Sequence, residues 1–250
     1  MKKLLALLLA VMMMATCFVG CAGNDSLTVK EGVLTMATNA EFPPYEFYEG
    51  DKVVGIDAEV AGLIADKLDL ELEIVDTDFD SIIPGVQANK YDMGMAGMTV
   101  SKERLESVNF STTYAKGVQV VIVKDGGSIK SLDDLKGAKI GVQQGTTGDI
   151  YASGDYGEDA VTRYANGAVA VEALKSGKVD CVIIDNEPAK AYVKENTGLS
   201  ILDTEYANED YAICFAKENT ELQEKVNAAL EELIEDGSVA KVVNKYIPAE

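Results

Sequence analysis

The chain has 250 residues, of which 47% are hydrophobic and 26% are charged, and its formal net charge is −20. This acidity argues against a nucleic-acid-binding protein, which needs a basic surface to contact phosphates. The chain contains no histidine, so the commonest general base and the commonest metal ligand are both missing.

The first twenty residues are predicted to be a signal peptide. Lys2 and Lys3 precede an apolar run over residues 4–14 that is too short to span a bilayer comfortably. After Cys21 there is no second apolar run of membrane length, so we expect the remainder to be soluble. Removing the two lysines with the leader takes the net charge from −20 to −22.

Gly20 and Cys21 lie a few residues after the apolar run, and Cys17, which follows a threonine, is a weaker competitor. A glycine before a cysteine at this place resembles the lipobox of bacterial lipoproteins, although Phe18 stands where leucine is usual. The resemblance implies a diacylglyceryl group with palmitate-type acyl chains on Cys21, which anchors the protein to the cell membrane through a lipidated linker over residues 21–30. A plain secretory signal with an incidental cysteine is the alternative.

The rest of the chain alternates strand and helix patterns and begins with a βαβαβ unit, which predicts a parallel, doubly wound α/β sheet. Asp57 is predicted to cap the first helix of this unit, and Pro84 lies near the start of the second. The predicted strands cover 33–37, 70–74 and the segment from Asp92, and the predicted helices cover 57–68, 81–89 and a segment from Ser101.

A second α/β unit follows, and the connections near Tyr114 and Tyr211 predict two lobes joined by a two-stranded hinge. Cys181 and Cys214 lie in strand-like runs. An exported protein could form a disulfide between them, but we favour two buried thiols. The predicted strands are 118–123, 139–142, 180–184 and 211–216; the predicted helices are 132–135, a segment after 145–148, 168–176, 186–195, a segment from the Thr220–Gln223 capping box, and one from Ser238.

The segment from Asp92 to Arg104 indicates a ligand site at the end of a buried strand. Gly94 and Gly97 lack side chains and allow another group to approach the backbone. Thr99 offers a hydroxyl, and Arg104 offers a planar donor fork suited to a carboxylate. An ordinary strand–turn–helix with a surface arginine is the alternative.

Five local patterns together resemble the substrate-binding proteins of polar amino-acid ABC transporters, family 3 of the bacterial extracellular solute-binding proteins. They are 37–47, 55–59, 92–104, 141–148 and, more weakly, 180–185. The resemblance implies the type II periplasmic-binding-protein fold, with residues 31–114 and 211–250 in lobe 1 and residues 115–210 in lobe 2. Ala58 departs from the family pattern, where a larger residue is usual.

The resemblance also implies the residues that bind the ligand. Arg104 would grip the α-carboxylate, aided by the helix start near Ser101. Asp185 would pair with the α-ammonium group, although it could instead cap the following helix, and Arg104 could instead pair with a neighbouring glutamate. The other expected ligand-binding residues are Asn39, Phe42, Phe79, Ala96, Gly97, Thr99, Thr146 and Thr147.

The aromatic and threonine residues of this set have alternatives as well. Phe42 and Phe79, expected to stack on the ligand, could be core residues, and Thr146 and Thr147 could be plain loop donors. We expect no cofactor and no metal: residues 76–80 mimic a calcium loop without its glycine and final glutamate, and residues 141–148 lack the ending of a phosphate-binding loop.

We therefore expect an extracytoplasmic monomeric receptor that closes on a free L-amino acid and delivers it to an ABC permease. An exported dehydratase-like enzyme and a sensor module on the same fold are the alternatives. In the family that the chain resembles, members that prefer basic ligands often carry an acid at the Asn39 position. The neutral Asn39 therefore favours glutamine or another polar neutral ligand, whereas an inward Glu41 or Glu46 would favour arginine or lysine.

Overall fold

Residues 27–248 are described by the structure, which is a computed structural model. The signal peptide, the lipidated Cys21 and most of the 21–30 linker lie outside the described residues and stay predictions. Within 27–248, no helix is long and apolar enough to cross a membrane.

The first sheet has the strand order β5-β1-β6-β14-β7. Strand β1 lies between β5 and β6 and runs parallel to both, as the βαβαβ pattern predicts. Only β14 enters antiparallel, because it comes from the C-terminal part of the chain. The strands are β1 (Val33–Thr38), β5 (Glu71–Asp76), β6 (Met93–Gly94), β7 (Val108–Phe110) and β14 (Cys214–Ala216).

The second sheet has the order β10-β9-β11-β8-β12, and β13 also pairs with β8. Its parallel strands β9, β10 and β11 are joined by helices, whereas β8 is antiparallel to β11, β12 and β13. The strands are β8 (Ala115–Lys124), β9 (Ile140–Gln143), β10 (Val161–Tyr164), β11 (Cys181–Asp185), β12 (Leu199–Ile201) and β13 (Ala207–Tyr211). A small third sheet joins β2 (Glu41–Phe42), β3 (Glu46–Glu49) and β4 (Lys52–Val54).

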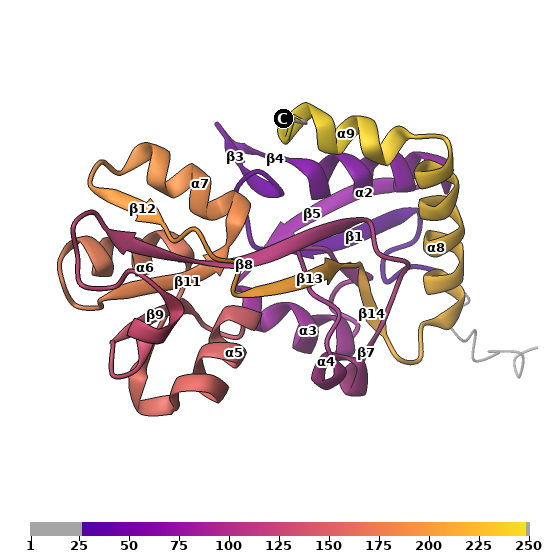
Figure 1. Cartoon of the computed structure of the whole chain (residues 1–250). Helices are drawn as coiled ribbons and strands as arrows, with labels where there is room; N and C mark the ends of the chain where they lie inside the picture. Colours follow the sequence, from indigo (N-terminus) through magenta and orange to yellow (C-terminus); the bar gives the residue numbers. More distant parts are fainter. Residues whose placement is uncertain (1–26, 249–250) are drawn as a thin grey trace, which may run out of the picture.

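Helices cover both faces of each large sheet, with a buried apolar cluster on either side (Figure 1). In the first unit α2, α8 and α9 pack together, and α3 lies against β1, β6 and β14. The helices are α2 (Ile56–Lys67), α3 (Phe79–Gln87), α4 (Lys102–Ser107), α5 (Thr147–Tyr156), α6 (Gly167–Lys175), α7 (Asn186–Glu195), α8 (Thr220–Glu235) and α9 (Ser238–Tyr246), with 3-10 turns η1 (Leu132–Leu135) and η2 (Glu158–Ala160).

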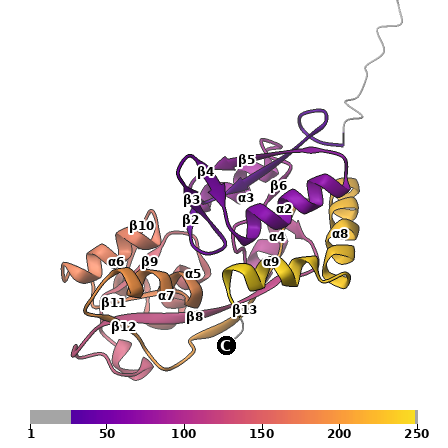
Figure 2. The same ribbon diagram turned by 90° about the horizontal axis from the view of Figure 1, so that it is seen from above.

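The long strand β8 and the shorter strand β13 cross between the two units and form the hinge (Figures 1 and 2). They pair antiparallel from Ala115 opposite Tyr211 to Gln119 opposite Ala207. The α/β fold with two doubly wound lobes and a two-stranded hinge is thus confirmed. We propose the lobe boundaries predicted above, 31–114 with 211–250 and 115–210, on the basis of these crossings.

Four local predictions were wrong. Pro84 lies inside α3 and not near its start. The predicted strand 211–216 is two strands, β13 and β14, because the chain leaves the hinge and enters the first sheet here. Helix α2 is capped by Gly55, and the Asp57 side chain bonds instead to Gly97 and Tyr114. Helix α8 is capped by Asn219 and not by Thr220. Cys181 and Cys214 are free buried thiols, as favoured.

Candidate functional site

A nearly closed cavity lies between the lobes, and every residue predicted to bind ligand lines it. Its free volume is about 10 Å³, roughly room for one water molecule. An amino acid is far larger, so it can reach the cavity only when the lobes separate. The lining residues are Asn39, Phe42, Glu46, Phe79, Ala96, Gly97, Thr99, Arg104, Gln143, Thr146, Thr147 and Asp185.

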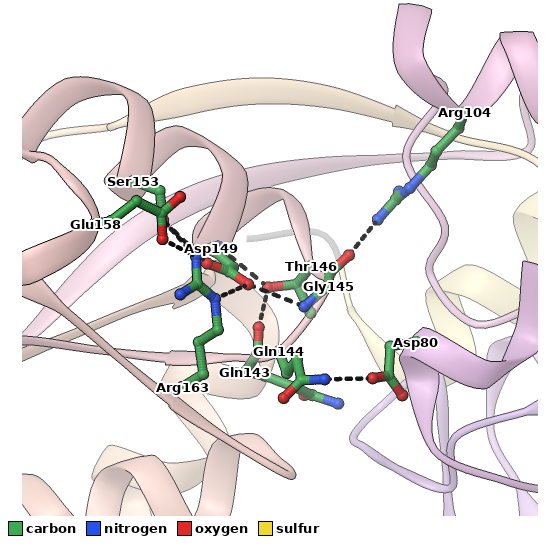
Figure 3. Close-up of polar contacts among 10 residues, drawn as sticks. All are labelled: Asp80, Arg104, Gln143, Gln144, Gly145, Thr146, Asp149, Ser153, Glu158 and Arg163. Atoms are coloured by element: carbon green, nitrogen blue, oxygen red, sulfur yellow. Dashed lines mark hydrogen bonds and ion pairs between the residues drawn. The ribbon is translucent and has the colours of Figure 1, made fainter.

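Arg104 reaches from α4 across the cleft (Figure 3). Its Nη1 donates to the Thr99 carbonyl at 2.9 Å and its Nη2 to the Gly145 carbonyl at 3.2 Å. Its guanidinium carbon lies 5.3 Å from the centre of the Phe79 ring. Ser101 caps the helix by accepting from the Arg104 backbone, as the sequence predicts. Arg104 is 6% exposed, so it is not a surface partner of the neighbouring glutamates.

The loop from Gln143 to Asp149 is shaped by a buried carboxylate (Figure 3). Asp149 accepts from the Gly145 backbone at 3.1 Å, from Ser153 at 3.1 Å and from Arg163 Nε at 2.9 Å. The Thr146 side chain caps α5 and donates to the Gln143 carbonyl at 2.9 Å. The Thr146 hydroxyl is therefore used locally, and the first turn of α5 is left facing the cavity, where helix N-termini favour anions.

Asp185 lies at the end of β11, and its side chain makes no capping bond to α7. Instead, Asp185 accepts from Gln119 Nε2 at 2.7 Å and from the Tyr211 hydroxyl. Burial, together with the nearby charge of Glu209, raises the pKa of Asp185 to about 7.

Glu46 lines the cavity, although the sequence did not predict whether its side chain points inward or outward. It is fully buried, and neither of its carboxylate oxygens has a hydrogen-bond partner among residues 27–248. Burial and the neighbouring Asp57 charge raise the pKa of Glu46 well above its usual range. Glu41, the other candidate, is exposed. No simple pattern signals this, since alternation in β3 would place Phe47 inside and Glu46 outside.

Asp57 stands behind the cavity and fixes its backbone. Its Oδ2 accepts from the Gly97 amide at 2.8 Å and from the Tyr114 hydroxyl at 2.9 Å. Gly97 has φ +51°, and a Cβ there would lie 2.7 Å from the Phe42 ring. The wall formed by Gly97 and Phe42 therefore needs glycine at this position.

Polar contacts hold the lobes together around the cavity. Gln143 donates to Asn39 at 2.9 Å, and Gln143 is the second lining residue that the sequence did not single out. Outside the cavity, Gln144 donates to Asp80 at 2.6 Å (Figure 3). On another part of the rim, the Tyr192 hydroxyl donates to the Glu41 carbonyl at 2.9 Å. The structure is thus a closed form.

Residues 34–249 match the family described as bacterial extracellular solute-binding proteins, family 3. The chain belongs to this family. The predicted family is therefore confirmed, and family 3 members are binding proteins, so the prediction that the chain is not an enzyme is confirmed as well.

Relatives of this family 3 protein are similar along nearly their whole length. The arginine-binding extracellular protein ArtP of Bacillus subtilis is 34% identical, with 100% of both chains covered. A solved ancestral arginine-binding protein bound to glutamine is 42% identical with a TM-score of 0.83, covering 88% of this chain and 100% of that one. An ancestral arginine-binding protein bound to arginine is 43% identical with a TM-score of 0.81, covering 86% and 98%.

Proposed function

We propose that this family 3 protein is an extracytoplasmic receptor for a cationic L-amino acid, with arginine as the leading candidate, which it delivers to an ABC permease. Glu46 is the observation that carries the proposal. A buried carboxylate without hydrogen-bond donors is costly, and a guanidinium or ammonium group is the partner that would satisfy it. This replaces the earlier preference for glutamine, which rested on the neutral Asn39.

The charges of the closed cavity support a cation. Three buried carboxyl groups, Glu46, Asp57 and Asp185, lie in or against the cavity, and Arg104 is the one basic residue that lines it in the described part of the chain. In the proposed pose, Arg104 and the start of α5 bind the α-carboxylate, and Asp185 binds the α-ammonium group. Phe42 and Phe79 flank the side chain, and its cationic end reaches Glu46.

Glutamine is the second candidate, because one similar protein was solved with glutamine bound. In that case Glu46 would remain a neutral acid beside Asp57, and the ligand would need no charge. The two candidates make opposite predictions for the removal of the Glu46 charge.

The deciding experiment compares Glu46→Gln with Glu41→Gln, a control in the same hairpin whose side chain is exposed. If a cation binds at Glu46, Glu46→Gln raises the arginine Kd about 10- to 100-fold, since hydrogen bonds to charged groups contribute about 1.5–3 kcal/mol. Glutamine affinity should change less than about threefold. Unchanged arginine binding in Glu46→Gln, measured by calorimetry, would contradict the cationic assignment.

The assignment as an amino-acid receptor is tested by thermal unfolding of the chain without its first twenty residues, measured in the presence of each L-amino acid in turn. A ligand at 100 times its Kd adds about 2.7 kcal/mol of stability, a shift of several degrees. A folded, ligand-free sample that shifts with none of them would contradict the amino-acid receptor.

We further propose that the protein acts as a monomer anchored to the membrane by lipid on Cys21. The Gly20–Cys21 pair after an apolar run supports the anchor. Mass spectrometry of the exported protein should find a diacylglyceryl group on Cys21, and Cys21→Ala should release the protein from the membrane fraction. An unmodified, freely released wild-type protein would contradict the anchor.

A further inference from the structure

Two buried carboxylates accept hydrogen bonds from the same amide nitrogen where the hinge meets the cavity. Gln119 Nε2 lies 2.7 Å from Asp185 Oδ2 and 2.9 Å from Glu209 Oε2. Gln119 belongs to β8 and Glu209 to β13, so both crossing strands contribute to the cluster. Asp185 is 7% exposed and Glu209 is 5% exposed. Because one nitrogen serves both groups, their oxygens lie close together, and both side chains are largely buried in this closed form.

The Glu209 carboxylate is only half satisfied. Its Oε1 has no hydrogen-bond partner within residues 27–248. The nearest guanidinium, that of Arg104, already donates to two backbone carbonyls. The titratable and charged groups around the pair are Arg104 from α4, Tyr151 from α5, Tyr211 from β13, Tyr45 and Glu46 from the β2–β3 region, Asp57 from α2, Lys116 from β8 and Glu187 from α7.

Most of these neighbours are acids or phenols, which disfavour a second negative charge, whereas Arg104 attracts both carboxylates. Like charges in a buried pair raise the pKa of one member. Burial and Glu209 together raise the pKa of Asp185 to about 7. The Asp185–Glu209 pair therefore favours a singly protonated state near neutral pH when no cation is bound.

Both carboxyl groups also contact space outside the ligand cavity. Asp185, Lys116 and Tyr211 line a separate cavity of about 90 Å³, large enough for water. Glu209 lines an open groove of about 530 Å³ together with Asp210 and Tyr151. A proton can therefore move between the pair and solvent while the lobes are closed on a ligand.

We propose that Asp185 and Glu209 share one proton in the ligand-free protein, and that capture of the ligand's α-ammonium group releases this proton to solvent. The carboxyl O–H bond breaks, the proton passes to water, and the ammonium group keeps its own protons while donating to the carboxylates. This rests on the proposed function only in that the ligand carries an ammonium group. Its side chain is not involved. Affinity then falls about tenfold for each pH unit below the upper titration of the pair.

The first test needs no ligand. The side-chain carboxyl carbons of Asp185 and Glu209 are followed by ¹³C NMR from pH 4 to pH 9 in the wild-type protein, Glu209→Gln and the control Asp210→Asn, which changes an exposed carboxylate one residue away. We expect Asp185 to titrate near pH 7 in wild type and Asp210→Asn, and at least one unit lower in Glu209→Gln. An Asp185 midpoint below pH 5 in wild type, or one that Glu209→Gln does not move, would overturn the proposal.

The second test counts protons during binding. Calorimetry at pH 6 in phosphate and imidazole buffers, with whichever amino acid gives the largest thermal shift, should show about one proton released by wild type and Asp210→Asn. Glu209→Gln should bind with release of nearly none, and its Kd should depend less on pH. Binding by wild type without proton release would overturn the proposal. If no amino acid binds, the receptor function fails, and the NMR titration alone decides whether the pair shares a proton.

Discussion

Gln143 donates a 2.9 Å hydrogen bond from its side chain to the side-chain oxygen of Asn39, and the two residues belong to opposite lobes. Both residues also line the cavity, so this contact between the lobes forms part of the cavity wall. The Gln144–Asp80 and Tyr192–Glu41 contacts lie outside the cavity. Closure is thus stabilised in part by groups that need not touch the ligand.

Tyr192→Phe should weaken ligand binding without changing specificity. The substitution removes only the hydroxyl that donates to the Glu41 carbonyl at 2.9 Å across the cleft. One such bond contributes about 0.5–1.5 kcal/mol to the closed form, so the Kd of every ligand should rise about two- to tenfold. Tyr206→Phe is the matched control, because the Tyr206 hydroxyl bonds to Asp155 within a single lobe. Calorimetry that finds equal affinity for both variants and wild type would show that this contact does not contribute to closure.

Arg104→Lys should abolish most binding although it keeps the positive charge. A lysine ammonium lacks the planar fork that lets Arg104 bond the Thr99 and Gly145 carbonyls at once and still face a carboxylate. Loss of such a buried charged contact costs about 2–5 kcal/mol, so the Kd should rise about 100-fold or more for all amino acids. Lys102→Ala, on the exposed face of the same helix, should bind normally. A near-normal Kd in Arg104→Lys would remove Arg104 from the carboxylate site.

The sequence predicted the site residues at strand ends better than it predicted buried charges. Thr99, Arg104 and Asp185 follow apolar strands, and the topology of an α/β sheet brings such ends together. The sequence does not predict the inward orientation of Glu46, because hydrophobic alternation assumes that carboxylates face water. Glu209 was missed for the same reason, since its neighbours Asn208 and Asp210 are exposed and polar.

Helix caps and short strands were the other local failures, and each has a tertiary cause. Asp57 resembles an N-cap by type and position, yet its carboxylate is drawn to Gly97 and Tyr114, which are distant in sequence. Strand β6 spans only Met93–Gly94, because the chain then turns to line the cavity. A Cβ at Gly94 would lie 2.4 Å from Ile82 and 2.7 Å from the Cys214 sulfur, so that short strand also needs glycine.

Asp57→Asn should flatten the pH dependence of stability. Burial raises the pKa of Asp57 to about 6, although the bond from Gly97, the neighbouring Glu46 and the bond from Tyr114 lower it. The folded protein therefore holds this proton more tightly than the unfolded chain, and stability falls as pH rises from about 4 to about 6. The shift corresponds to about 3 kcal/mol. Urea unfolding should show the wild type losing about this much relative to Asp57→Asn between pH 4 and pH 7. Parallel pH profiles for the two proteins would contradict the raised pKa.

Asp92→Ala should destabilise the fold through its N-terminal edge. The Asp92 carboxylate accepts from the Val29 amide at 2.6 Å, from the Thr35 amide at 2.7 Å and from the Thr35 hydroxyl. Removing it leaves the buried Thr35 amide and the partly buried Val29 amide without their acceptor, which costs about 2–4 kcal/mol of unfolding free energy. The exposed Asp51→Ala should change stability by less than about 0.5 kcal/mol. Equal urea midpoints for Asp92→Ala and Asp51→Ala would contradict this role.

Gly117→Ala should disturb the hinge and the ammonium site together. A Cβ at Gly117, in β8, would lie 2.1 Å from the Tyr211 hydroxyl oxygen. That hydroxyl donates to Asp185. The ring cannot withdraw easily, because Tyr211 is fully buried and its ring meets Tyr45 edge-on at 5.2 Å.

We expect Gly117→Ala to lower the unfolding free energy by about 1–3 kcal/mol and to weaken binding of every amino acid, because overpacking displaces Tyr211 from Asp185. The control is Gly62→Ala in α2, where a Cβ meets nothing within 4 Å. That substitution should stabilise the protein by about 0.4–1 kcal/mol. A Gly117→Ala variant that is as stable as wild type and binds its ligand as tightly would contradict this prediction. Tyr211 and β8 would then have to lie farther apart in solution, and Gln119 would have to orient Asp185 without Tyr211.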